Sequence, residues 1–237
     1  MKDNIFILNI KISTLKPAVI KQRVCAWLSQ KQQHQITTPN PEVLISALTD
    51  DVFHHLLNAV DLNIPDGIGL KFAAWLQGKN IYRLAGADLV QSLLTTANNK
   101  NLPIAIISWR LGLSNAQEIS QALKQRWPRL KFIIQEIDKD QLNYNLTELK
   151  NQQPALLLCS LGAPEQDKLI FDLLPQLPSV KIGMGVGGSF DYLTGKTKRA
   201  PKLWRNLGLE WLWRLLIQPE NKLLRLQRIY RAVIYLS

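Results

Sequence analysis

Short apolar segments alternate with helix-period segments over most of this chain, and this alternation is the strongest constraint on its fold. The apolar segments are nearly continuous hydrophobic runs, which is typical of parallel strands buried on both faces. Parallel strands need long crossover connections, and helices usually supply them. The sequence therefore predicts an α/β fold with a mostly parallel sheet and helices on both of its faces.

The periodicity also gives approximate bounds for each element. Strands are expected at Ile5–Ile10, Gln35–Thr38, Leu62–Ile64, Pro103–Ser108, Lys131–Gln135, Ala155–Ser160 and Val180–Met184. Helices are expected near Pro17–Gln30, Pro41–Val60, Ile68–Gln77, Asp88–Asn99, Asn115–Arg126, Gln141–Asn151 and Glu165–Leu174. Two more are expected after the alternating region, around Leu203–Ile217 and Glu220–Tyr235.

Positive charge is concentrated in the last part of the chain. The net charge is +11, and residues 196–237 hold ten Lys and Arg side chains against Glu210 and Glu220. In the last expected helix, Arg225, Arg228 and Arg231 lie opposite an apolar arc. This pattern suits an anionic membrane surface, and it also suits a terminal helix docked on its own domain. We expect an α/β core at 1–195 and a basic helical appendage at 196–237.

Composition disfavours several other classes of protein. Cys25 and Cys159 lie in apolar stretches, as small core residues of a reducing compartment do. The three histidines lack metal-ligand spacing, and no apolar run suits a spanning helix or a signal peptide. Asp138-Lys139-Asp140 lies in a charged stretch typical of a solvated loop, and no RNA-binding aromatic signature accompanies the basic tail. We therefore expect a cytoplasmic protein with no metal, cofactor or nucleic-acid partner.

Polar clusters follow several expected strands, and ligands of α/β sheets bind at these carboxyl ends. In Thr37–Pro41, Asn40 could cap a helix, or Thr38 and Asn40 could contact a sugar or base. In Pro65-Asp66-Gly67, Asp66 could form a turn or act as a general base. Arg83 could bind a phosphate or form a surface ion pair.

Two glycine-containing clusters follow later strands. Gly162–Asp167 passes into a helix, so its backbone N–H groups and the Gln166 amide could hold an anion. Its acidic residues could instead complement the helix dipole. Gly183–Asp191 holds four glycines in six residues, including Gly187 and Gly188, and this allows a ligand to approach the backbone closely. The spacing fits neither a P-loop nor a dinucleotide fingerprint.

Taken together and in this order, the clusters resemble the WecG/TagA/CpsF glycosyltransferases, glycosyltransferase family 26. The resemblance covers about residues 35–219. It rests on Thr38-Pro39-Asn40-Pro41-Glu42, Pro65-Asp66-Gly67-Ile68-Gly69, Gly162-Ala163-Pro164-Glu165-Gln166, Gly187-Gly188-Ser189-Phe190-Asp191, Gly195, Arg199-Ala200-Pro201 and Gly208-Leu209-Glu210-Trp211-Leu212-Trp213-Arg214-Leu215.

The resemblance implies a Rossmann-like fold and an inverting, metal-independent transfer from a UDP-sugar. The donor sugar is typically N-acetylmannosamine or its uronic acid. The acceptor is an undecaprenyl-diphosphate-linked N-acetylglucosamine at the inner face of the cell membrane. The products feed wall teichoic acid and other surface polysaccharides, and members of the family can self-associate.

The resemblance also assigns roles to residues of this chain. Asp66 matches the proposed base, which deprotonates the acceptor hydroxyl. Thr38, Asn40, Arg83 and Gln166 match positions that line the pocket, to which the Gly187-Gly188 turn adds backbone. Arg214 matches the first of the arginines that stabilise the leaving diphosphate. Lys222, Arg225 and Arg228 are expected to contact the diphosphate or the membrane.

The chain departs from the family pattern in three places. Ser108-Trp109-Arg110-Leu111-Gly112 stands where the family has a glycine-rich turn, and Asp167 replaces a glutamate. Lys222 and Arg225 stand one residue after the usual arginine positions, which hold Asn221 and Leu224. The first departure leaves another function open, a non-catalytic nucleotide-sugar-binding or assembly protein whose donor pocket Trp109-Arg110 has closed. The basic tail leaves a nucleic-acid-binding protein as a second rival.

Overall fold

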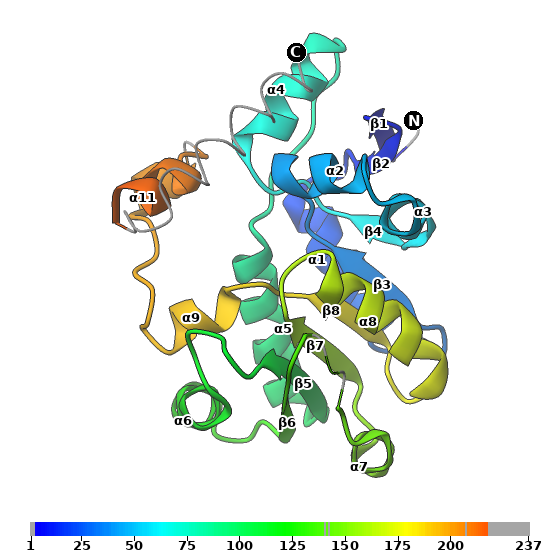
Figure 1. Ribbon diagram of the computed structural model, residues 1–237, viewed down its shortest axis with the longest axis vertical. Helices are drawn as coiled ribbons and strands as arrows, with labels where there is room; N and C mark the ends of the chain where they lie inside the picture. The colour runs from blue at the N-terminus through cyan, green and yellow to red at the C-terminus, as the bar shows by residue number, and fades with distance from the viewer. Residues whose placement is uncertain (1–2, 140, 142, 207, 218–237) are drawn as a thin grey trace. The chain divides into compact units, whose positions relative to one another are not determined.

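The structure is a computed structural model that describes residues 3–139, 141, 143–206 and 208–217 (Figure 1). These residues form two compact units. The first combines residues 3–17, 38–85 and the described residues from 198 on. The second combines residues 18–37 and 86–197. The expected boundary between residues 195 and 196 stays a prediction.

An antiparallel hairpin opens the first unit. It pairs β1 (Asn4–Ile7) with β2 (Ile10–Ser13), in the register Ile7 to Ile10. The two residues between the strands have positive φ, 49° at Leu8 and 59° at Asn9. The single strand expected at Ile5–Ile10 is therefore wrong, because the chain reverses direction inside it.

Three helices and a short strand follow in the first unit: α2 (Pro41–Ala47), α3 (Asp51–Ala59), β4 (Leu62–Asn63) and α4 (Ile68–Leu76). The single helix expected over residues 41–60 is in fact α2 and α3. The break follows from Asp50, whose side chain accepts a hydrogen bond of 2.9 Å from the Phe53 N–H and so starts a new helix.

The first unit also contains α10 (Lys202–Asn206) and α11 (Glu210–Ile217). One continuous helix was expected here, and Gly208 interrupts it with a φ of 75°. A Cβ at Gly208 would lie 3.1 Å from the Ile68 Cβ, so this turn packs tightly against the start of α4. The close approach and the positive φ together account for a glycine here.

The second unit holds five of the six strands of the main sheet, in the order β3-β8-β7-β5-β6. All four pairings within this unit are parallel, as expected from the apolar runs. The residues of the central strands are buried, apart from Trp109 and Ser160, which end their strands and are half-buried. The bounds are β3 (His34–Thr37), β5 (Ile104–Trp109), β6 (Phe132–Ile137), β7 (Leu156–Ser160) and β8 (Ile182–Gly185).

Helices connect these strands, and α8 (Glu165–Leu173) packs against β7 and β8 (Figure 1). Glycines on β8 allow a very close contact. A Cβ at Gly183 would lie 2.4 Å from the Ile170 Cγ2. The other helices are α1 (Pro17–Trp27), α5 (Gly86–Lys100), α6 (Ala116–Arg126), α7 (Leu146–Gln152), the 3-10 turn η1 (Leu174–Gln176) and α9 (Ser189–Leu193).

Candidate functional site

The loop Pro65-Asp66-Gly67 of the first unit, called the Asp66 loop below, is held by backbone hydrogen bonds on both sides. The Asp66 N–H donates to the Pro39 carbonyl at 2.9 Å, and the Leu84 N–H donates to the Pro65 carbonyl at 3.3 Å. Three segments far apart in the sequence therefore meet at this loop. The start of α4 packs closely against the start of α2 beside this loop, because a Cβ at Gly69 would lie 2.6 Å from the Pro41 Cγ.

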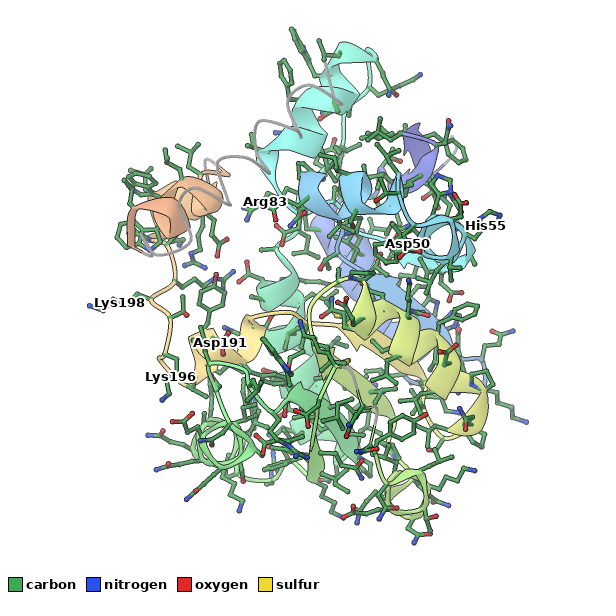
Figure 2. The ribbon with its side chains drawn as sticks, in the orientation of Figure 1. Asp50, His55, Arg83, Asp191, Lys196 and Lys198 are labelled. Atoms are coloured by element: carbon green, nitrogen blue, oxygen red, sulfur yellow. The ribbon has the colours of Figure 1, made fainter. Side chains whose placement is uncertain are left out.

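Arg83 joins this loop to α11. Its Nε lies 3.3 Å from the Asp66 Oδ1, and its Nη2 donates to the Glu210 Oε2 at 3.0 Å. Its Nη1 donates to the Arg205 carbonyl at 2.7 Å. Figure 2 shows Arg83 on the segment between α4 and α5. The structure thus brings Asp66 and Arg83 together and adds Glu210 to them; we call this set the Asp66–Arg83–Glu210 network.

This network is mostly withdrawn from water, with Asp66 its most accessible member. The Asp66 side chain is 32% exposed, whereas those of Arg83 and Glu210 are 16% and 10% exposed. A second guanidinium also approaches Glu210, with the Arg199 Nε 3.6 Å from Oε1. Charges in such a setting attract one another more strongly than surface charges do. The most accessible carboxylate of the network is therefore held by groups that are themselves less exposed.

Thr38 and Asn40 flank Pro39, whose carbonyl accepts the hydrogen bond from the Asp66 N–H. Both are half-buried. The Asn40 Oδ1 accepts a hydrogen bond of 3.0 Å from the Val43 N–H, so Asn40 is the N-cap of α2. This confirms the capping interpretation of the cluster. A contact of Thr38 or Asn40 with substrate stays a prediction.

Gln166 connects two strand ends in the second unit. Its Oε1 accepts hydrogen bonds from the Gly162 N–H at 3.2 Å and the Gly187 N–H at 3.0 Å. Gly162 follows β7 and Gly187 follows β8, and these strands are neighbours in the sheet. The side chain is buried. The Gly162 N–H, which belongs to the cluster expected to hold an anion, is therefore paired with Gln166, and so is the Gly187 N–H.

A buried carboxyl lies next to Gln166. Asp167 is 2% exposed, and this burial raises its pKa to about 7, although a hydrogen bond from Gln166 acts in the opposite direction. Burial likewise raises the pKa of the Cys159 thiol to about 12. Cys159 is therefore an inert core residue, as its apolar surroundings in the sequence indicated.

The glycine-rich segment that begins in β8 does two different things. Gly183 and Gly185 face α8, since a Cβ at Gly185 would lie 2.4 Å from the Gln166 Nε2. These two glycines therefore serve helix packing, whereas a close approach of ligand to backbone was expected. Gly187 has a φ of 47°, and a Cβ added there would meet no described atom within 4 Å. Close approach of a ligand stays a prediction for Gly187 and Gly188.

Asp191, at the end of the same motif, fixes a neighbouring turn. Its Oδ1 accepts a hydrogen bond of 2.7 Å from the Ser114 hydroxyl (Figure 2 shows Asp191 in α9).

The Trp109-Arg110 departure from the family pattern lies just before Ser114. The Lys139 ammonium lies 4.2 Å from the centre of the Trp109 ring, and Arg110 pairs with Asp138 at 3.4 Å. Basic and aromatic groups thus gather where β5 and β6 end.

The remaining expected site residues lie in or beyond α11. Arg214 belongs to α11, and Lys222, Arg225 and Arg228 lie outside the described residues. Over the part of the chain that the structure describes, no three His, Cys, Asp or Glu side chains form a metal site. Over the same residues, no helix has both the length and the apolar character needed to cross a bilayer.

Sequence reasoning gave Glu210 no role beyond its place in a motif. Its side chain nevertheless receives both Arg83 and Arg199. A signal was present, because Glu210 is the only acidic residue between Asp191 and Glu220, in a segment rich in apolar and basic residues. A lone carboxylate in such a segment is buried only when it is paired.

Comparison with known proteins gives two findings. The profile of the glycosyl transferase WecG/TagA/CpsF family matches residues 5–236. The N-acetylglucosaminyldiphosphoundecaprenol N-acetyl-beta-D-mannosaminyltransferase of Bacillus subtilis (strain 168) is 29% identical over 196 residues, which covers 81% of this chain and 75% of that protein. Both matches span the Asp66 loop and the Gln166 region.

Proposed function

Because the chain belongs to the WecG/TagA/CpsF glycosyltransferase family, we propose that it transfers N-acetylmannosamine, its uronic acid or a related hexose from UDP. The proposed acceptor is a polyprenyl-diphosphate-linked N-acetylglucosamine. The name of the Bacillus subtilis relative supports both choices, since it describes an N-acetylmannosaminyl transfer onto that kind of acceptor. The product would enter teichoic acid or another cell-surface polysaccharide.

Asp66 is the proposed base of an inverting, metal-independent transfer. The Asp66 carboxylate takes the proton of the acceptor hydroxyl while that oxygen forms a bond to the anomeric carbon. The bond from the anomeric carbon to the UDP oxygen breaks, and UDP leaves with its electron pair. Attack from the face opposite UDP inverts the configuration. The single observation that carries this proposal is the partly exposed Asp66 held 3.3 Å from Arg83.

Arg83 and Glu210 are proposed to hold the base in its working geometry. Arg83 already uses all three of its nitrogens on Asp66, Arg205 and Glu210. This supports a positioning role for Arg83 beside the pocket-lining role that the resemblance implies. An arginine partner also favours the ionised form of a carboxylate, which is the form that a base needs.

The other side chains are proposed to bind substrate. Thr38 and Asn40 would contact sugar or base next to the Asp66 loop. Gln166 would shape the donor pocket by holding the Gly162 and Gly187 turns, and a Rossmann-like sheet with helices on both faces would carry these turns. Arg214, together with Lys222, Arg225 and Arg228, would neutralise the leaving diphosphate or contact the membrane.

The proposed location is the inner face of the cell membrane, with the protein bound peripherally. A polyprenyl acceptor resides in a bilayer, so the enzyme must meet it at that surface. The net charge of +11 favours anionic lipid. Self-association of the chain is compatible with this location and forms part of the same proposal.

Release of UDP by the purified protein tests the reaction. The assay would combine a lipid-linked N-acetylglucosaminyl diphosphate with a panel of UDP-sugars that includes UDP-N-acetylmannosamine. Release that needs the acceptor and occurs with one donor would identify the substrate. Absence of release with every donor, in a protein that still binds UDP, would contradict the catalytic proposal.

The Trp109 turn favours a second candidate function. The stacking of Lys139 on Trp109 places bulky groups where the family has a glycine-rich turn. A closed donor pocket there would leave a non-catalytic nucleotide-sugar-binding or assembly protein. Replacing Ser108–Gly112 with a glycine-rich turn would then create activity, whereas an active wild-type protein would exclude this candidate.

A further inference from the structure

Helix α4 exposes a stripe of large apolar side chains. Ile68, Phe72, Trp75 and Leu76 are 36%, 53%, 67% and 48% exposed. Their spacing of four, seven and eight residues places them on one side of a helix. The Phe72 and Trp75 rings stack with centroids 5.8 Å apart, so these two side chains form one apolar surface. We call these four residues the α4 face.

Within the α4 face, Ile68 contacts the Gly208 turn, and the larger exposures belong to Phe72, Trp75 and Leu76. The opposite side of α4 already buries Leu70, Ala73 and Ala74 in the first unit. A surface helix of a soluble domain normally carries polar residues on its outer side. Contiguous exposed aromatic and aliphatic side chains of this kind mark a surface that meets another apolar phase or a partner.

The charges beside the α4 face are positive. A shallow hollow beside Ile68, Phe72 and Trp75 is also lined by Lys71, Gly78, Lys79 and Asn80, and no carboxylate stands among its described lining residues. Gly78, with a φ of 68°, ends the helix, and the Lys79 N–H then donates to the Ala74 carbonyl at 2.9 Å. The backbone at Lys79 is thereby fixed at the edge of the hollow. Aromatic rings flanked by lysines suit the headgroup region of an anionic bilayer.

We propose that the α4 face inserts into the headgroup region of a membrane that carries anionic lipid. It would do so in addition to any contact made by the basic C-terminal segment. A second copy of this chain fits the face less well, because a two-fold pairing would bring the same positive charges, Lys71 and Lys79 of each copy, into one interface. Anionic lipid complements both the rings and the lysines.

This inference deepens the proposed function, because it places the base next to the lipid that carries the acceptor. Helix α4 begins at Ile68, two residues after Asp66, and its nine residues span about 13 Å. A helix lying in the interface would hold Asp66 close to the plane where a polyprenyl diphosphate leaves the bilayer. The acceptor would then need no extraction from the membrane.

Sedimentation of the full-length protein with phosphatidylcholine vesicles, with and without phosphatidylglycerol, tests the contact. F72S/W75S should weaken partitioning onto the anionic vesicles by about tenfold. V52S/F171S, which removes two other exposed apolar side chains, should change it little. K71E/K79E should weaken it by about twentyfold at low salt and less at high salt, whereas K21E/K124E on α1 and α6 should have a smaller effect.

Three outcomes would overturn the proposal. The first is unchanged partitioning of F72S/W75S, and the second is an equal loss in V52S/F171S. The third is a dimer in sedimentation velocity that F72S/W75S dissociates while vesicle binding stays the same, which would assign the face to a second copy.

A failure of the proposed function would look different. D66N should partition like the wild type, so vesicle binding does not depend on catalysis. F72S/W75S should retain activity on a water-soluble short-chain acceptor and lose it on acceptor embedded in vesicles. Protein that partitions through the α4 face but releases no UDP with any donor would refute the glycosyl transfer and leave the membrane contact supported.

Discussion

Two loop regions, one in each unit, are held by different chemistry. In the first unit, the Asp66–Arg83–Glu210 network is ionic and Asp66 is partly exposed. In the second unit, the buried Gln166 amide holds two glycine N–H groups by neutral hydrogen bonds. An ionic network beside solvent is suited to proton transfer, whereas a buried amide is suited to fixing backbone. Substitutions in the first should therefore affect activity most, and substitutions in the second should affect stability most.

The largest expected effect is that of Asp66→Asn on turnover. Asparagine keeps the shape of the side chain and cannot accept the acceptor proton, so kcat should fall about 10³-fold. The thermal midpoint should stay near that of the wild type. UDP release and a thermal melt measure both quantities, with Asp172→Asn on α8 as the matched control. An active D66N protein would remove Asp66 from the chemistry.

Gln166→Leu should show the opposite balance. It leaves the N–H groups of Gly162 and Gly187 without their acceptor, and the free energy of unfolding should fall by about 2–4 kcal/mol. Urea unfolding measures this, and Gln121→Leu on the exposed side of α6 is the control. If Gln166→Leu is as stable as the wild type but inactive, the residue acts on substrate and the contrast between the two units fails.

The pH dependence of stability tests the neighbouring buried carboxyl. Asp167 has a pKa raised to about 7 in the folded protein against an ordinary 3.8. Between these pH values the Asp167 carboxyl is ionised in the unfolded chain and protonated in the folded protein. The free energy of unfolding therefore falls as pH rises from about 4 to about 7 and then levels off. The total change is about 4 kcal/mol in the free energy of unfolding, and Asp167→Asn should remove most of it in urea unfolding measured across this pH range. A variant with the same slope as the wild type would show that Asp167 is already ionised.

Glu210→Gln is expected to have the smallest effect on stability. It removes the charge of Glu210 and keeps its shape, so it tests whether the ionic contact with Arg83 positions Asp66. Glutamine keeps one acceptor for Arg83 and loses the attraction to Arg83 and Arg199, so stability should fall by about 1–2 kcal/mol. If Arg83 positions Asp66, kcat should fall while KM changes little, and the pH profile of kcat should shift. A change in KM alone would assign the network to substrate binding.

The fold was largely predictable because buried parallel strands leave an unmistakable apolar pattern. The hairpin at Leu8-Asn9 was missed because its turn uses leucine where glycine or aspartate usually signals a reversal. The break at Gly208 was missed because its cause is the contact with Ile68, 140 residues earlier in the sequence. Single contacts between distant segments leave no periodic signal.

The sequence motifs were enough to single out most candidate site residues, whereas the contacts among those residues required the structure. Asp66 and Arg83 could each be singled out from the motif order, and their 3.3 Å contact required the structure. Glu210 was missed since its importance comes from two arginines that approach from other segments. Gln166 was anticipated as a site residue, but its hydrogen bonds with the Gly162 and Gly187 N–H groups were not.

The tight contact between β8 and α8 restricts how these two segments can diverge in evolution. A larger residue at Gly183 would need a smaller one at Ile170, so these positions can exchange volume as a pair. Gly185 has no such freedom, because its neighbours are the Gln166 amide and the Asp167 carboxyl, which cannot shrink without losing their hydrogen bonds. We expect compensated substitutions at positions 170 and 183 among related sequences and an unvarying glycine at 185.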